Sequence, residues 1–250
     1  MTALAADLAL ALDPVNMAER VGITPDGWQA EALRSGAPRA LWNCSRQSGK
    51  STIAALLAVH GALYEPGTLQ LLLSPSERQS GELFKKCASA YRTLGRPVPP
   101  ASETALTVTL ENGSRIVSLP GRSGTVRGYS GVRRLIVDEA AWVLDELYFA
   151  VLPMLAVSGG SLLAMSTPNG KRGWWHAEWV EGGPEWQRVE VPATRCPRIG
   201  PAFLAEQRRR MPRARYEQEY QCAFGEAEGA AFAYEDIQAA LDPEVTPLWS

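Results

Sequence analysis

The sequence lacks the features that mark membrane and secreted proteins. No run of 18 or more apolar residues occurs among its 250 residues, which excludes a membrane-spanning helix. The N-terminus has no basic region, and Asp7 interrupts its apolar stretch, so we expect no signal peptide and a cytoplasmic protein. With 46% apolar and 21% charged residues, the composition is that of an ordinary globular protein.

Metal-binding and nucleophilic side chains are scarce. The chain has only four cysteines, none of them at C-x-x-C spacing, which argues against a zinc knuckle and against a disulfide framework. Its two histidines, His60 and His176, are far apart in the sequence. A histidine-rich metal site or a histidine-based catalytic triad is therefore not expected.

Net positive charge is also absent. The formal net charge is −2, which provides no overall attraction for nucleic acid, so any DNA contact must come from a local patch. One candidate patch has five arginines within eight residues: Arg208, Arg209, Arg210, Arg213 and Arg215. The alternative is a solvated helix face whose charge is balanced by Glu206, Glu217 and Glu219.

Short apolar runs alternate with helical stretches along the chain, which favours an α/β fold with helices on both faces of a sheet. The runs predict buried strands at 40–43, 69–73, 135–137, 161–165 and 186–191. Helices are expected at 3–12, 28–35, 50–63, 77–93, 140–156, 174–180, 201–210 and 234–241. Between alternating residues 107–119, Asn112-Gly113 predicts a hairpin turn. We expect an N-terminal helical annex (1–24), one main domain (25–225) and a C-terminal linker or tail (226–250).

The strongest motif lies between a predicted strand and a predicted helix, which is the context a phosphate-binding loop requires. It reads Ser45, Arg46, Gln47, Ser48, Gly49, Lys50, Ser51 and Thr52. Small residues let backbone N–H groups surround phosphates, the lysine reaches the β and γ phosphates, and the hydroxyl of Ser51 holds Mg²⁺. Cys44 stands where the full pattern has glycine. Taken alone, the motif leaves an ordinary helix start as the alternative.

A second motif is an apolar strand that ends in two carboxylates, Asp138 and Glu139. Asp138 is placed to hold Mg²⁺ together with Ser51, and Glu139 is placed to activate the attacking water. The second acid is typical of P-loop hydrolases of the additional-strand glutamate type. We therefore expect a P-loop NTPase with a mostly parallel central sheet flanked by helices.

Three further positions carry candidate roles. Arg127, in a glycine-rich loop, is a candidate arginine finger, and Arg46 in the phosphate loop competes for that role. Ser166 and Thr167 follow a strand and are candidates for coupling nucleotide state to motion, although Pro168-Asn169-Gly170 also favours a plain turn.

Trp28-Gln29 precedes the phosphate loop by about 20 residues. An amide has both a donor and an acceptor, so Gln29 is a candidate to bind the adenine edge. Trp28 is more simply a core residue.

Together these motifs resemble the ATPase domain of the large terminase subunit of tailed bacteriophages. The resemblance rests on Trp28-Gln29, on SRQSGKST at 45–52, VRGYSG at 126–131, LIVDEA at 135–140 and STPNG at 166–170. It implies an ATP- and Mg²⁺-dependent motor that moves viral DNA into a procapsid in the host cytoplasm. In such a motor Glu139 is catalytic and Arg127 is offered to a neighbouring subunit's ATP.

The resemblance also implies partners: double-stranded DNA, bound weakly by this domain alone, a ring of identical subunits, the portal protein and the small terminase subunit. In the family a nuclease domain follows the ATPase domain. Because the present sequence stops at Ser250, we expect no nuclease activity from it.

Three alternatives remain at this stage. The first is another P-loop ATPase of helicase type, although 250 residues leave no room for a second motor domain. The second is a nucleotide-binding assembly module without turnover, and the third is a small-molecule kinase, for which no lid is evident.

Overall fold

The computed structural model describes residues 3–121 and 128–226. Its centre is an eight-stranded sheet in the order β3-β4-β5-β2-β6-β7-β1-β8. In chain order the strands are β1 (Arg39–Cys44), β2 (Leu69–Ser74), β3 (Pro100–Glu103), β4 (Thr107–Leu110), β5 (Arg115–Pro120), β6 (Val132–Asp138), β7 (Ser161–Ser166) and β8 (Trp186–Val191). All five predicted strands are confirmed, and β3 is an addition at one edge.

In this spatial order, every neighbouring pair from β5 across to β8 is parallel. Only the pairs β3–β4 and β4–β5 are antiparallel. The phosphate-loop strand β1 and the acidic strand β6 are not neighbours, because β7 pairs with both of them. This inserted strand is the arrangement expected for the additional-strand type. The predicted hairpin is confirmed as β4 and β5, and Gly113 adopts the positive φ (+83°) that its turn requires.

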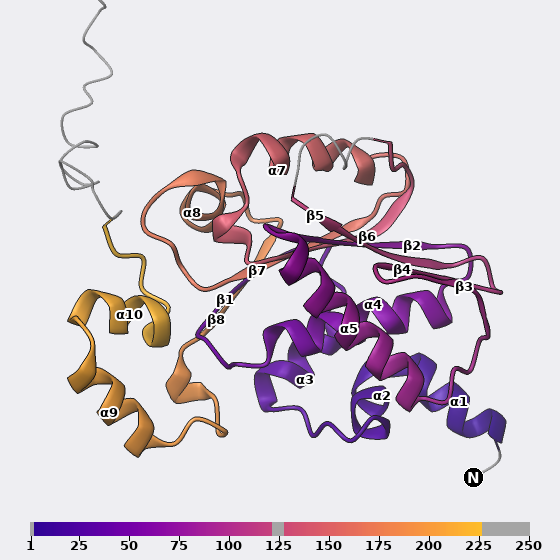
Figure 1. The fold of residues 1–250 in the computed structure, drawn as a ribbon, viewed down its shortest axis with the longest axis horizontal. Coiled ribbons are helices and arrows are strands. Elements are labelled where there is room, and N and C mark those ends of the chain that lie inside the picture. Colours follow the sequence, from indigo (N-terminus) through magenta and orange to yellow (C-terminus); the bar gives the residue numbers. More distant parts are fainter. Residues whose placement is uncertain (1–2, 122–127, 227–250) are drawn as a thin grey trace, which may run out of the picture.

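Helices cover both faces of the sheet (Figure 1). One face carries α1 (Ala3–Leu12), α2 (Pro14–Arg20), α3 (Gly27–Arg34), α4 (Lys50–Tyr64) and α5 (Glu77–Thr93), and the other carries α7 (Asp145–Val151) and α8 (Gly173–Val180). Alternating strand side chains serve the two cores: Leu72 joins the α4 side, whereas Leu71 and Leu73 join the α7 side. Burial on both faces explains why these strands read as continuous apolar runs.

The C-terminal part of the described chain forms a small separate cluster of helices, which we call the C-terminal arm (residues 192–222). It contains a short 3₁₀ turn, η3 (Ala193–Arg195), followed by α9 (Pro201–Arg210) and α10 (Arg213–Gln221). The arm lies beside the end of β1 in Figure 1. Helix α9 matches its predicted bounds, whereas α10 was not expected, because its sequence has almost no apolar periodicity.

The predicted helix at 140–156 is wrong as a single element. The structure has a 3₁₀ turn, η1 (Ala140–Trp142), then α7, then a second turn, η2 (Leu152–Leu155). Val143 and Leu144 have extended backbones that interrupt the first half. Leu152 keeps a helical backbone, but Pro153 has no N–H to donate to the preceding turn, so α7 ends at Val151 and the chain continues as η2.

Helix α1 has its predicted bounds, and the short helix α2, whose first residue is Pro14, was not predicted. Proline is well tolerated at that position, and the Asp13 side chain caps the helix by accepting the Val15 N–H at 3.0 Å. Val15, Met17 and Ala18 of α2 are buried in the same core as α4, whereas α1 leaves Leu4, Leu8 and Leu12 exposed.

The predicted helix at 234–241 lies outside the described residues, as does almost all of the predicted tail. Among the described residues, no helix has the length and hydropathy needed to cross a bilayer.

Candidate functional site

The phosphate-loop residues and the acidic pair lie at one edge of the sheet. Because β1, β6 and β7 are parallel, their carboxyl ends meet there. In the register, Asn43 at the end of β1 is level with Ser166 of β7, and Asp138 of β6 is level with Met165. The two motifs that stand far apart in the sequence are therefore brought to a single site.

The loop between β1 and α4 has the conformation that a phosphate-binding loop needs. Gln47 (φ +61°) and Gly49 (φ +88°) are left-handed, which turns the chain sharply into α4. The N-cap Gly49 makes no side-chain cap, so the first N–H groups of α4 are not satisfied by a capping side chain. A helix start of this kind attracts anions.

The side chains of α3 and of the C-terminal arm hold the loop from outside. The carbonyl oxygen of Ser48 accepts hydrogen bonds from Gln29 Nε2 at 3.0 Å and from Arg198 Nη2 at 2.8 Å. Arg198 Nη1 also donates to Asp26 Oδ1 at 2.7 Å, and the Asp26 N–H donates to Gln29 Oε1 at 3.0 Å. These four contacts form a closed network, which we call the Ser48 brace.

Gln29 is thus placed differently from the prediction that it binds adenine. Its side-chain oxygen and nitrogen both bond to protein, and the residue is only 3% exposed. Trp28 is a core residue, as expected, with its ring edge-on to Trp42. The adenine contact of Gln29 stays a prediction, and the described geometry gives it a bracing role.

Lys50 and Glu139 form an ion pair, with Nζ and Oε1 3.2 Å apart. Burial would lower the pKa of Lys50, but the carboxylates of Glu139 and Asp138 outweigh burial and raise that pKa above its ordinary value. Lys50 therefore carries its positive charge throughout the physiological pH range.

Asp138 is almost fully buried at the end of β6, and Glu139 follows it with a left-handed backbone (φ +50°). Burial raises the pKa of Asp138, and the charge of Lys50 opposes this rise. A hydrogen bond with Ser51 also favours the ionised carboxylate. The strained backbone of Glu139 aims its side chain back at Lys50, and strain of this kind is common at functional sites.

Cys44 fills the position where the usual pattern has glycine. It is completely buried at the end of β1, and burial raises the pKa of its thiol far above the ordinary range. The first residue of this loop with a positive φ is Gln47. The backbone at position 44 is therefore one that a residue with a side chain can adopt, and glycine is not required there. Cys44 serves as a core residue under the loop.

The other predicted residues differ in where they lie. Ser166 and Thr167 are buried at the end of β7, and the Ser166 hydroxyl has no hydrogen-bond partner among the residues that the structure describes. Arg46 forms an ion pair with Glu219 of α10, and its backbone N–H donates to the Glu219 carbonyl at 3.1 Å. Arg46 is therefore tied to the C-terminal arm. Arg127 lies outside the described residues.

An open cavity of about 740 Å³ lies over the loop. This size is within the usual range for small-molecule sites. Its lining includes predicted residues 46–52 and Glu139, together with Gln79, Lys86, Trp142 and Arg198, which were not predicted. Sequence reasoning missed these four because no local motif marks them and they come from α5, η1 and the arm.

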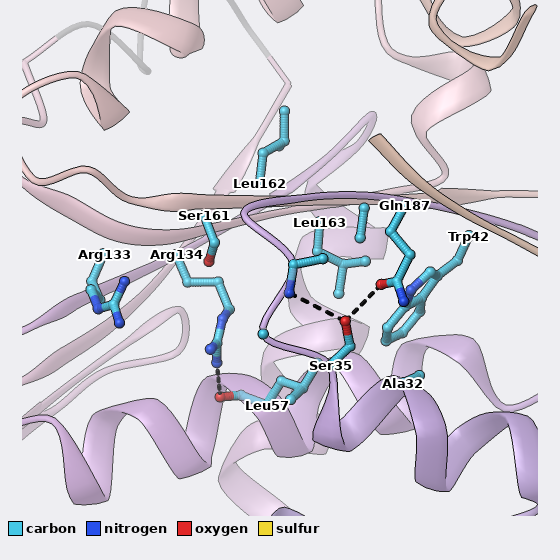
Figure 2. A pocket seen from close by; sticks show the side chains of 13 residues that line it. Ala32, Ser35, Trp42, Leu57, Arg133, Arg134, Ser161, Leu162, Leu163 and Gln187 are labelled. Carbon is cyan, nitrogen blue, oxygen red and sulfur yellow. Dashed lines mark hydrogen bonds between the residues drawn. The ribbon is translucent and has the colours of Figure 1, made fainter. Parts of the chain in front are cut away.

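A smaller cavity of about 120 Å³ lies at the beginning of the strands, away from the loop (Figure 2). There Arg134 donates to the Leu57 carbonyl at 2.6 Å, and Ser35 donates to Gln187 at 2.7 Å. These polar groups are already bonded within the protein: Arg134 joins β6 to α4, and Ser35 is bonded to β8. The larger cavity over the phosphate loop is therefore the candidate site.

The residues present fit a nucleotide with Mg²⁺. The start of α4 has no capping side chain, and Ser51 and Asp138 supply the hard oxygen ligands that Mg²⁺ prefers. Among the residues that the structure describes, no three or more histidine, cysteine or carboxylate side chains lie together in a way that could hold a metal ion. Mg²⁺ bound through one carboxylate and substrate phosphates needs no such group.

The family model and the curated relatives that match this chain indicate one family. Residues 41–239 match the family model for the N-terminal part of the terminase large subunit, T4likevirus type. The terminase large subunit of Thermus virus P23-45 is 26% identical over 263 residues, covering 90% of this chain and 54% of that protein. The chain spans about half the length of the curated relatives it matches.

Two solved structures share the fold. The large terminase ATPase domain of Thermus phage P74-26 matches with a TM-score of 0.74 and 22% identity, covering 83% of this chain and 96% of that one. The large terminase of a thermophilic bacteriophage, solved in complex with ADP, matches with a TM-score of 0.63 and 12% identity, covering 84% and 53%.

Proposed function

Because the chain belongs to the family of terminase large subunits, we propose that it is the ATP-hydrolysing domain of a motor that drives viral DNA into a procapsid. The observation that carries the proposal is the Lys50–Glu139 ion pair beside Asp138, at the mouth of an uncapped phosphate loop. A binding module without turnover has no need of a half-buried glutamate aimed at the phosphate-binding lysine. In infected cells such a motor works in the host cytoplasm.

Binding of ATP uses the loop and the start of α4. The backbone N–H groups of residues 46–52 surround the phosphates, and Lys50 contacts the β and γ phosphates. Ser51 and Asp138 hold Mg²⁺, which when bound neutralises charge on the phosphate oxygens. A similar large terminase was solved in complex with ADP, which supports binding of a nucleotide.

Glu139 acts as the general base. It orients a water molecule in line with the γ-phosphorus and accepts its proton as the water oxygen attacks. In the described state Glu139 is held by Lys50, so the phosphates must draw Lys50 away before Glu139 is free to act. Hydrolysis is thereby tied to a fully seated triphosphate.

An arginine is needed to stabilise charge in the transition state. Arg127 of a neighbouring subunit is the first candidate, and Arg46 in cis is the second. Arg46 is paired with Glu219 and would have to leave it. Ser166 and Thr167 lie at the same edge and would relay loss of the γ-phosphate to β7 and the segment after it.

The proposed partners are duplex DNA, identical subunits in a ring, the portal protein and the small terminase subunit. We expect weak DNA affinity and no DNA cleavage from these 250 residues. A helicase-like ATPase or an assembly module without turnover are the competing functions.

The test is ATP hydrolysis measured over a wide protein concentration range, beside Lys50→Ala and Glu139→Gln. We expect turnover that rises more than linearly with concentration, because neighbours complete the site, and loss of turnover in both variants. Strictly proportional turnover would favour Arg46 in cis. If ATP did not bind to the wild-type protein, the proposal would be wrong.

A further inference from the structure

Arg134 lines the small cavity at the beginning of the strands and uses little of its hydrogen-bonding capacity there (Figure 2). Of its five N–H groups, one on Nη1 donates to the Leu57 carbonyl oxygen at 2.6 Å. Within the described chain, Arg134 forms no other hydrogen bond and no ion pair. Because none of its nitrogen atoms is both buried and without a partner, the unused donors face open space rather than packed side chains.

The positive charge of Arg134 is balanced only in part. Burial lowers the pKa of its guanidinium, Glu65 opposes this lowering in part, and Arg133 adds to it. Glu65 is itself paired with Arg133, an exposed residue that also lines the cavity. Among the described residues that line the cavity, none is an aspartate or a glutamate. A bound anion would therefore neutralise a partly buried cation that has no counter-charge in contact with it.

Two neutral donors line the same cavity. Arg134 of β6 is level with Ser161 of β7 in the parallel register, so their side chains lie next to each other. The Ser161 hydroxyl has no hydrogen-bond partner in the part of the chain that the structure describes. Gln187 of β8 accepts the Ser35 hydroxyl at 2.7 Å through Oε1, which leaves its Nε2 without an acceptor among the described residues. A guanidinium, a hydroxyl and an amide N–H are groups that donate hydrogen bonds to oxyanions.

The size of the cavity selects a small ligand. Its volume of about 120 Å³ exceeds the roughly 30 Å³ of one water molecule but lies below the roughly 300 Å³ at which sites for larger organic ligands begin. The buried residues Ala32 of α3 and Leu57 of α4 close the side that faces the helices. A single tetrahedral oxyanion suits this space, whereas a whole nucleotide does not.

We propose that this cavity binds a phosphate-type oxyanion, held by the Arg134 guanidinium and the Ser161 hydroxyl, at the edge of the sheet opposite the phosphate loop. The site goes beyond the proposed function and does not depend on it. The ligand is either a free inorganic phosphate ion or a single phosphate group of a nucleic acid, since both offer the same oxygen acceptors.

The anion lies at the far ends of two elements that carry the nucleotide site. Strand β6 begins beside this cavity and ends at Asp138, and α4 runs from Lys50 at the phosphate loop to Tyr64. The Arg134 bond to the Leu57 carbonyl already joins β6 to α4, and an anion on the other donors would fix the guanidinium in that position. Phosphate should therefore raise the Tm, because a ligand that binds only the folded state stabilises it.

The test is equilibrium dialysis with radiolabelled inorganic phosphate, which counts the bound ions. Wild type should bind one ion at the phosphate loop and one in this cavity. Arg134→Gln, which keeps a donor for the Leu57 carbonyl, should weaken the cavity ion about tenfold or more and leave the loop ion in place. Ser161→Ala should weaken the same ion severalfold, and it tests the site even if Arg134→Gln does not fold.

The matched control is Arg39→Gln. Arg39 begins β1 at the same edge of the sheet and donates to the Pro38 and Gly160 carbonyls at 3.1 and 3.0 Å, but it does not line the cavity. This variant loses the same charge and should bind phosphate like wild type. Unchanged binding in both Arg134→Gln and Ser161→Ala, or an equal loss in Arg39→Gln, would overturn the site.

Lys50→Ala separates this site from the phosphate loop. It should remove the loop ion and leave the ion at Arg134, so a loss of all phosphate binding in Lys50→Ala would also overturn the cavity site. If Lys50→Ala changes nothing, the proposed function fails and the cavity site stands. Duplex DNA is then added to Lys50→Ala as a competitor: displacement of phosphate assigns the site to nucleic-acid phosphates, and retention assigns it to the free ion.

Discussion

Lys50 and Glu139 neutralise each other across the mouth of the site, with 3.2 Å between Nζ and Oε1. Lys50 is the first residue of α4, and Glu139 directly follows β6. Strand β7 lies between β6 and β1, the strand that leads into the phosphate loop. The lysine side chain is 9% exposed and the glutamate side chain 26% exposed, so water screens the pair only in part. An arriving triphosphate competes with Glu139 for the same cation.

Glu139→Gln should therefore separate binding from hydrolysis. Removing the carboxylate frees Lys50 for the phosphates, so ATP affinity should stay the same or rise severalfold. Loss of the general base should lower turnover by about 10²–10⁴-fold. Affinity is measured by calorimetry and turnover by phosphate release.

The control is Glu82→Gln, which removes an equal charge from an exposed ion pair on α5. It should change neither quantity. A Glu139→Gln variant that hydrolyses ATP at the wild-type rate would remove Glu139 from the mechanism.

Gly49→Ala should damage the phosphate loop. A Cβ at this position would lie 2.7 Å from Gln29 Nε2 and 3.3 Å from Arg198 Nη2, and the backbone has φ +88°. The left-handed conformation alone costs roughly 1–2 kcal/mol for a residue with a Cβ. We expect a lower Tm and at least a tenfold loss of ATP affinity, measured by thermal denaturation and calorimetry.

Gly36→Ala is the matched substitution, because an added Cβ at Gly36 meets nothing within 4 Å and φ is not in the positive range. Its Tm and affinity should be close to wild type. Equal behaviour of the two variants would mean that the Ser48 brace does not constrain the loop.

How much of the site could be predicted depends on how local its signals are. Lys50, Ser51, Asp138 and Glu139 are marked by short motifs whose strand, loop and helix context can be read from neighbouring residues. The parallel order of β1, β7 and β6 then brings the motifs together. Arg198 has no such motif: its partner Asp26 is 172 positions away, and only the folded arm brings them into contact.

The same reasoning explains the errors in the fold. Apolar strands buried on both faces have a strong signal, and all five were predicted to within about three residues at each end. Helix α10 has too few apolar residues for a periodic signal and is held through Tyr220 and Glu219. The break between η1 and α7 follows from the backbone at Val143 and Leu144, which the sequence does not mark.

Acid should weaken the attachment of α1 through His60. The Nε2 of this half-buried side chain lies 3.2 Å from the Leu10 carbonyl oxygen and 3.1 Å from that of Ala11, so it donates as the neutral ring. Burial lowers the pKa of His60, and the two carbonyls oppose this only in part. A lowered folded-state pKa gives stability that is present above the unfolded value of about 6.5. It is lost as pH falls through the folded value.

His60→Phe removes this titration and leaves both carbonyls without their donor, which should cost about 1 kcal/mol at pH 7. The Tm of wild type should fall toward that of the variant between pH 7 and pH 5. Thermal denaturation across this range measures the difference in Tm between wild type and His60→Phe. A Tm difference that stays constant or widens in acid would mean that titration of His60 does not weaken the attachment of α1.

The arginines at the junction of α9 and α10 should contact DNA phosphates. All five are exposed, and Arg210 and Arg213 pair with Glu206 and Glu217. Within the described chain, Arg208, Arg209 and Arg215 form no ion pair. Arg213 and Arg215 also stand in the first turn of α10, where the helix dipole disfavours cations. Such a concentration of charge on an acidic protein favours a polyanion as partner.

Replacing Arg208, Arg209 and Arg215 by alanine should weaken duplex DNA binding and make its salt dependence shallower. Each lost phosphate contact reduces the slope of log affinity against log salt by about 0.9, so the slope should change by roughly 2–3. The control removes three other exposed arginines, Arg20, Arg78 and Arg115, and an equal total charge. Fluorescence anisotropy at several salt concentrations measures the DNA affinity and the salt dependence of both triple variants. If both triple variants lose the same affinity, only net charge matters, and the α9–α10 junction is a solvated helix face rather than a DNA contact.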